Sequence, residues 1–124
     1  MKIEVSNGEI ADKYTILKLK LKHCTPMSSQ YFNIQEEYTI LFEAVDQLKL
    51  NQSLVEELYV INKELWEIED KIRVLEQQQD FGQEFVKLAR AVYITNDKRF
   101  LAKKKINTDS NSKLHEEKIL PKYD

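Results

Sequence analysis

Apolar residues recur along most of this chain at alternating steps of three and four, the spacing that places them on one face of an α-helix. The most regular stripe continues for three heptads without a fault, as in helices that pack as coiled coils. We therefore expect a long helix over about residues 54–79 with a coiled-coil-like seam. The seam residues are Leu54, Leu58, Ile61, Leu65, Ile68, Ile72 and Leu75.

Three weaker stripes with similar spacing predict three further long helices. Because the connections between the stripes are short, neighbouring helices are expected to run antiparallel. The sequence thus predicts an all-α fold: an antiparallel bundle of about four long amphipathic helices with coiled-coil-like heptad packing, forming one domain over residues 1–124. The predicted helices span about 7–23, 28–50, 54–79 and 81–106, with a short helical segment over 112–119.

Polar residues ahead of each stripe predict where the helices begin, because their side chains can accept hydrogen bonds from free backbone N–H groups. Residues 1–5 alternate between apolar and polar, a pattern compatible with a short strand that has no evident partner strand. The candidate caps are Ser6 with Glu9, Thr25 or Ser28, Ser53 with Glu56, and Asp80 with Gln83.

The composition agrees with long helices, since the chain has only two glycines and two prolines. A charged fraction of 32% and a mean hydropathy of -0.55 suit helices with one solvated face. No apolar run approaches the roughly 18 residues that span a bilayer, and the N-terminus lacks the apolar core of a signal peptide. With Cys24 as the single cysteine, these features predict a cytoplasmic protein without a membrane segment.

Charge is distributed unevenly between the last two predicted helices. Residues 51–80 carry three basic against eight acidic side chains, whereas residues 81–107 carry seven basic against two acidic ones. One interpretation is that these opposite charges fix the pairing and register of the two helices. The other is that the last helix presents a basic patch to phosphate or nucleic acid. The patch would consist of Lys98, Arg99, Lys103, Lys104 and Lys105.

Polar residues interrupt the apolar face of the last predicted helix at Thr95, Asn96 and Arg99. If the last two helices pair symmetrically about their connection, Arg99 comes to lie near Glu64 or Glu57. Since a buried charge is tolerated only when it is paired, the interruption is either a polar layer that fixes register or a ligand site within the bundle. The candidate ligand-binding residues are Asn96, Arg99, Glu64, Lys98 and Lys103.

Two aromatic residues, Tyr59 and Trp66, lie seven positions apart and off the main seam of the third predicted helix. This second stripe allows the helix to contact two neighbours. The favoured interpretation is packing against the first or second helix, and the alternative is a subunit interface, where tyrosine and tryptophan are enriched.

The residue types that carry catalysis do not occur in recognisable patterns. Di-iron helical bundles need a Glu-x-x-His motif, which this sequence lacks. His23 and His115 are far apart and have no zinc-site spacing, and Cys24 has no base close in sequence. We therefore predict no catalytic residue, no metal and no cofactor.

Three segments carry a resemblance to known sequences. They are V-S-x-G-E…D-K over residues 5–13, L-W-E-I-E-D over residues 65–70, and T-N-D-x-R over residues 95–99. Together they resemble an uncharacterised family of short all-helical proteins from bacteria and their phages. The resemblance implies a helical fold and brings no activity with it.

The leading functional hypothesis is a non-enzymatic interaction or scaffold protein that forms a homo-oligomer, most simply a dimer, with a further protein partner possible. The alternative is binding of an anionic ligand or nucleic acid through the basic last helix. A third hypothesis, ranked below both, is a small enzyme with its site inside the helical bundle.

Overall fold

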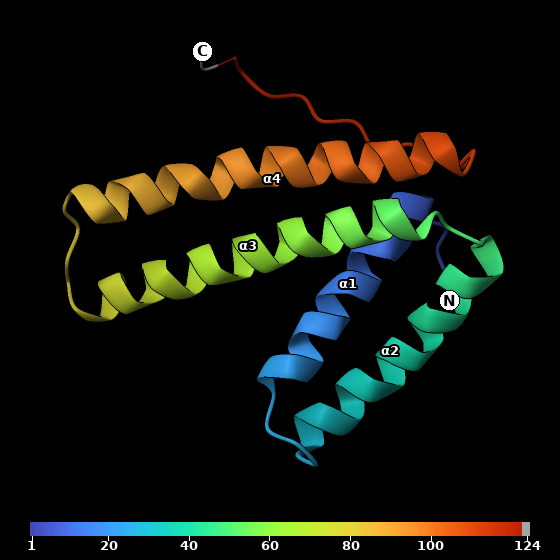
Figure 1. Cartoon of the computed structure of the whole chain (residues 1–124), viewed down its shortest axis with the longest axis horizontal. Helices are drawn as coiled ribbons and strands as arrows, with labels where there is room; N and C mark the ends of the chain where they lie inside the picture. The colour runs from blue at the N-terminus through green and yellow to red at the C-terminus, as the bar shows by residue number, and fades with distance from the viewer. Residues whose placement is uncertain (123–124) are drawn as a thin grey trace.

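The computed structural model describes residues 1–122, and helices account for most of them (Figure 1). The helices are α1 (Asn7–His23), α2 (Ser29–Leu48), α3 (Gln52–Gln77) and α4 (Gln83–Asp109). Figure 1 shows α3 and α4 side by side as one hairpin, with α1 packed across one end of that pair and α2 on the outer side of α1. The predicted all-α fold is confirmed, and its helices form two antiparallel hairpins, α1–α2 and α3–α4.

A capping side chain stands at the N-terminus of three of the helices. It accepts a hydrogen bond from one of the first backbone N–H groups, which have no partner within the helix. The Ser6 hydroxyl accepts a hydrogen bond from the Glu9 backbone N–H at 3.2 Å, and Ser28 caps α2 in the same way. For α3 the prediction of Ser53 is wrong. Asn51 is the cap, and its Oδ1 accepts a hydrogen bond from the Ser53 N–H at 2.9 Å. The helix therefore begins two residues before the predicted start, and Ser53 lies within its first turn.

The fourth helix begins without a side-chain cap, at Gly82, and this differs from the prediction of an Asp80 and Gln83 pair. Asp80 instead accepts a hydrogen bond from the Gly82 N–H at 3.2 Å, which closes the turn before the helix.

The two ends of the chain differ from the predictions, since neither 1–5 nor 112–119 forms regular structure among the described residues. Residues 112–119 were expected to be helical. Lysine side chains hold this segment along the molecule: Lys118 contacts Asp97 at 2.8 Å, and Lys113 contacts Glu4 at 3.2 Å. The segment thus pairs with residues distant in sequence and does not form a local helix.

The core lies at the end of the α3–α4 hairpin where α1 crosses it. Its buried members are contributed by α1, α3, α4 and the turn after α2. In contrast, α2 has no buried residue and packs against α1 alone. No helix within residues 1–122 has the length and apolar character needed to cross a membrane. The core residues are Ala11, Leu50, Leu58, Ala102 and Ile106.

Candidate functional site

A largely buried ion pair between Asp12 and Arg99 joins α1 to α4. Asp12 is only 1% exposed, and Arg99 binds it with two nitrogens. The Nε–Oδ1 distance is 2.9 Å and the Nη2–Oδ2 distance is 2.5 Å, which is the fork-like geometry that arginine forms with carboxylates. The Asp12 hydrogen bond, followed by the nearby carboxylates, raises the pKa of Arg99, although burial acts in the opposite direction.

Two further polar side chains complete this cluster, which we call the polar junction: Asp12, Thr15, Asn62 and Arg99. The Asn62 amide of α3 donates to Asp12 Oδ1 and to Thr15 Oγ1, both at 2.9 Å. No buried side-chain nitrogen or oxygen among the described residues lacks a hydrogen-bond partner. The junction is therefore saturated by the protein itself and links three helices.

A second polar contact fixes the N-terminus of α1 on the last turns of α4. The buried Asn107 side chain accepts a hydrogen bond from the Gly8 N–H at 2.6 Å. A Cβ atom on Gly8 would lie 2.5 Å from the Lys103 carbonyl oxygen. Only glycine permits this approach, because that distance is shorter than real Cβ contacts allow.

The structure corrects the predicted partner of Arg99. It binds neither Glu64 nor Glu57, and Glu57 instead contacts Lys105 at 2.9 Å. The expectation treated α3 and α4 as an isolated pair. In the structure α1 packs against both and supplies the buried carboxylate from Asp12.

The five predicted ligand-binding residues fall into two separate places. Asn96, Arg99 and Lys103 line a surface pocket of about 290 Å³ that is completed by Phe100 and by residues 116–118 of the C-terminal segment. Glu64 and Lys98 line a different, shallow depression between α3 and α4. The structure therefore divides the five residues between two places on the surface, and a ligand role for any of them stays a prediction.

The first pocket is filled in part by the protein's own charges. Lys103 is 8% exposed, and its Nζ contacts Glu116 at 3.0 Å and Glu9 at 3.4 Å. The Asn96 side chain accepts from Arg99 Nη1 at 3.4 Å. A cation that is already paired with a carboxylate attracts an external anion less strongly.

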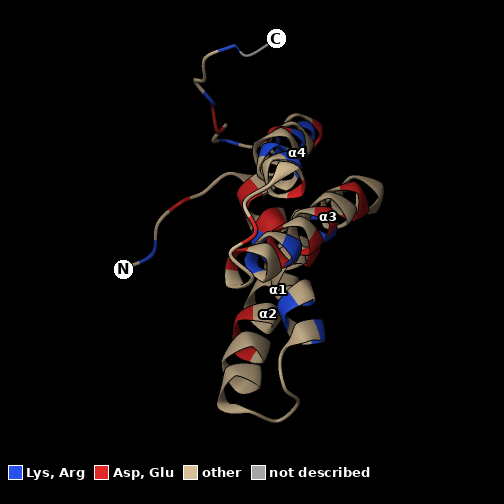
Figure 2. Ribbon diagram, turned by 90° about the vertical axis from the view of Figure 1, so that its left-hand side faces the viewer, with Lys and Arg blue, Asp and Glu red and all other residues tan. Residues whose placement is uncertain are grey.

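The predicted basic patch on α4 is neutralised at most of its positions. Arg99, Lys103 and Lys105 each contact a carboxylate from another part of the chain. Lys98 and Lys104 remain exposed. Figure 2 shows acidic residues interspersed with the basic ones along α3 and α4. Of these contacts, Lys105–Glu57 joins α4 to α3, whereas Arg99 and Lys103 bind carboxylates of α1 and of the C-terminal segment. That opposite charges fix the register of α3 and α4 therefore stays a prediction.

Sequence reasoning missed Asp12, Asn62 and Asn107, which carry the buried polar contacts. A signal existed, since Gly8, Ala11 and Thr15 place small side chains at helical spacing beside Asp12. Small residues allow close approach of a neighbouring helix. A carboxylate among them is then a candidate for a buried ion pair.

The aromatic stripe of α3 contacts α1, so the packing interpretation is confirmed for both residues. Tyr59 is buried and its hydroxyl accepts a hydrogen bond from Lys22 Nζ at 2.7 Å. The Trp66 ring stacks on His23 with a centroid distance of 4.7 Å.

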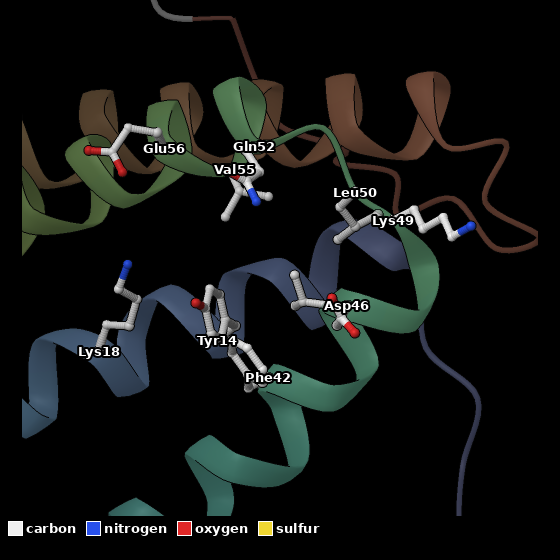
Figure 3. A pocket seen from close by; sticks show the side chains of 10 residues that line it. Tyr14, Lys18, Phe42, Asp46, Lys49, Leu50, Gln52, Val55 and Glu56 are labelled. Atoms are coloured by element: carbon white, nitrogen blue, oxygen red, sulfur yellow. The ribbon is translucent and has the colours of Figure 1, made fainter.

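A second pocket, of about 330 Å³, opens between α1, α2 and the start of α3 (Figure 3). Figure 3 shows Tyr14 and Phe42 close together, with Lys18 and Asp46 on either side. The ring centroids of Tyr14 and Tyr38 lie 5.4 Å apart, and their hydroxyl oxygens are 3.4 Å apart. Burial, together with the Tyr38 hydrogen bond, raises the pKa of Tyr14 to about 12.

No three histidine, cysteine, aspartate or glutamate side chains in residues 1–122 are grouped as a metal site would require. Two antiparallel hairpins joined by a saturated polar junction define the class, an all-helical protein. Residues 1–121 match a family of unknown function (DUF6165), and the chain belongs to this family. Comparison with curated proteins gives no match, and comparison with solved structures gives none.

Proposed function

We propose that this protein is a non-enzymatic interaction protein that works as a homodimer, using the α1–α2 hairpin as its contact surface. The observation that carries the proposal is the position of α2. This helix has 20 residues, none of them buried, and packs on α1 alone. Helices draw most of their stability from burying an apolar face. Helix α1 covers one side of α2, and no other helix of the described residues covers the rest of it.

The total accessible surface supports the same proposal. The chain exposes 8966 Å², whereas a compact monomer of its 14.7 kDa mass exposes about 6,900 Å². The extended ends account for part of the difference, and the uncovered hairpin for another part. Large apolar side chains on α2 remain exposed, among them Phe32 at 53%, Ile40 at 61% and Phe42 at 50%.

Binding of an anionic ligand or nucleic acid is a weaker proposal. It depends on the basic side chains of α4, and three of these contact carboxylates. The polar junction is likewise saturated by the chain's own groups. The hairpin surface, in contrast, has no covering element within the described residues.

Light scattering after size-exclusion chromatography tests the proposal at micromolar protein concentration. We expect a mass of twice 14.7 kDa. A mass of 14.7 kDa across the accessible concentration range would overturn it.

A matched pair of variants tests the surface. Phe32→Ser with Phe42→Ser should shift the protein toward monomer. Val74→Ser with Val86→Ser, which changes residues of similar exposure on α3 and α4, should leave the mass unchanged. Equal effects of both pairs would exclude the hairpin as the contact surface. Circular dichroism confirms that each variant retains its helices.

A further inference from the structure

The shallow depression between α3 and α4 is a groove that follows α4. It has a volume of about 490 Å³ and is lined by α4 residues from Gln83 to Lys98, which is about 22 Å or four turns of helix. The residues by which α4 binds α1, namely Arg99, Lys103 and Asn107, do not line it. We call this surface the α4 groove: Val86, Lys87, Arg90, Ile94 and Lys98 of α4 with Glu64 of α3.

Three cations of the α4 groove have no partner within the protein. Lys87, Arg90 and Lys98 are exposed and form no ion pair among residues 1–122, unlike the basic residues nearer the end of α4. One carboxylate, that of Glu64, lines the groove from α3. With three cations against one carboxylate, the α4 groove is positively charged and attracts an acidic partner.

Apolar side chains alternate with these cations along the same face of α4. Val86 is 53% exposed and Ile94 is 39% exposed, although both line a groove between two packed helices. The two are eight residues apart, as are Arg90 and Lys98, so each pair spans about 12 Å along the helix. A concave surface with apolar and charged positions at helical spacing is the kind that an amphipathic helix of opposite charge contacts.

From these features we infer that the α4 groove binds an acidic amphipathic helix of a partner protein, about four turns long. The apolar stripe of the partner packs on Val86 and Ile94, and its flanking carboxylates pair with Arg90 and Lys98. The inference rests on the proposed role as an interaction protein. It adds a second contact surface and the class of partner, and it does not depend on the dimer.

Two features favour a protein helix over nucleic acid as the occupant. The Glu64 carboxylate repels a continuous row of phosphates, whereas a helix presents carboxylates only at some of its positions. Val86 and Ile94 contribute nothing to phosphate binding, but an apolar stripe removes them from water.

Binding of a fluorescent synthetic peptide, followed by anisotropy, tests the inference on the full-length protein. The probe is a helical peptide of about 16 residues with leucines at alternating steps of three and four and glutamates on both flanks. We expect saturable binding whose Kd weakens about tenfold or more between about 0.05 M and about 0.5 M salt, because salt screens the charges. A peptide with lysine in place of each glutamate should not bind, and one with serine in place of each leucine should bind about tenfold more weakly or worse.

A matched pair of variants locates the binding site. Arg90→Glu with Lys98→Glu should weaken peptide binding about tenfold or more, because two attractions become repulsions. Lys63→Glu with Lys104→Glu makes the same charge change at exposed residues outside the groove, and its Kd should stay within about twofold of the wild type. Circular dichroism checks that the helices are retained. If the reversed protein unfolds, Arg90→Gln with Lys98→Gln gives the same comparison without adding repulsion.

The outcomes separate this inference from the proposed dimer. A wild type that does not bind the acidic peptide, or equal weakening by both pairs of substitutions, overturns the inference. A DNA duplex that binds the wild type more tightly than the peptide does, and is lost with Arg90→Glu and Lys98→Glu, overturns it in favour of nucleic acid. Loss of the dimer mass in that same variant overturns it in favour of a second copy as the occupant. A monomeric wild type that binds the peptide overturns the dimer alone.

Discussion

At the scale of single residues, the two members of the Asp12–Arg99 ion pair differ in how deeply they are buried. The Asp12 side chain is 1% exposed, whereas that of Arg99 is 28% exposed. Removing Arg99 leaves a buried carboxylate with only the Asn62 amide, while removing Asp12 leaves a cation that can still reach water. The two halves of the pair are therefore not equivalent in mutation.

We expect Arg99→Met to lower the free energy of unfolding by about 3–5 kcal/mol, the usual cost of stranding one member of a buried pair. The double variant Asp12→Leu with Arg99→Met should be more stable than this single variant, because no charge is left buried. Urea denaturation measures both. Arg90→Met, at an exposed position of the same helix, is the control and should change the value by about 0.5 kcal/mol or less. A single variant as stable as the double would show that the pair does not hold the junction.

Tyr14 gives a pH-dependent readout of the aromatic contact between α1 and α2. Its folded pKa of about 12 lies above the ordinary value of 10.0, so the folded state holds the phenolic proton more tightly. The stabilisation this brings is complete below pH 10 and is lost as pH rises toward 12. The unfolding free energy should therefore fall more steeply across that range in the wild type than in Tyr14→Phe. Chemical denaturation at several pH values measures it, and parallel slopes would contradict the raised pKa.

At the scale of elements, α1 can approach α4 closely because residue 8 is a glycine and has no side chain. Alanine stabilises helix interiors relative to glycine by about 1 kcal/mol. Gly8→Ala should nevertheless destabilise the protein by about 1–3 kcal/mol, because its Cβ would lie 2.5 Å from the Lys103 carbonyl. Gly82→Ala is the matched control, since its Cβ would meet only the Asp80 side chain at 3.3 Å. Thermal denaturation compares them, and a Gly8→Ala protein as stable as the control would mean that α1 and α4 can separate at little cost.

The four long helices could be predicted from the sequence because local rules decide them, whereas the short helical segment predicted over 112–119 does not form. Periodicity located all four, and Ser6 and Ser28 cap as their positions suggest. The cap of α3 was misassigned, because Asn51 and Ser53 both stand ahead of the stripe and pattern alone does not choose between them.

The candidate site was less predictable, because it depends on long-range packing. Asn96, Arg99 and Lys103, three of the five predicted ligand-binding residues, line one pocket, and their ligand role stays a prediction. The buried partner of Arg99, Asp12, lies 87 positions away from it in the sequence. Aligning the apolar stripes of α3 and α4 with each other cannot reveal a partner from a third helix. For this reason, Glu64 or Glu57 was assigned as the partner of Arg99.

At the scale of the whole molecule, stability is concentrated where α1 crosses the α3–α4 hairpin. The hydrophobic core cluster and the polar junction both lie there. Helix α2 adds no buried residue, and several of its large apolar side chains, among them Phe32 and Ile40, are exposed. If a second copy covers this surface, association and the folding of α2 become one equilibrium.

This coupling predicts that thermal stability depends on protein concentration. For a dimer that unfolds to separated chains, Tm should rise by about 3 °C for each tenfold increase in concentration, given the usual unfolding enthalpy per residue. The Phe32→Ser with Phe42→Ser protein should show a smaller slope and a lower helical signal before the transition, because an uncovered α2 frays. Circular dichroism over a hundredfold range of concentration measures both quantities. A wild-type Tm that does not move would mean that the hairpin α1–α2 is stable without a partner, with the buried contacts of α1 sufficient to hold it.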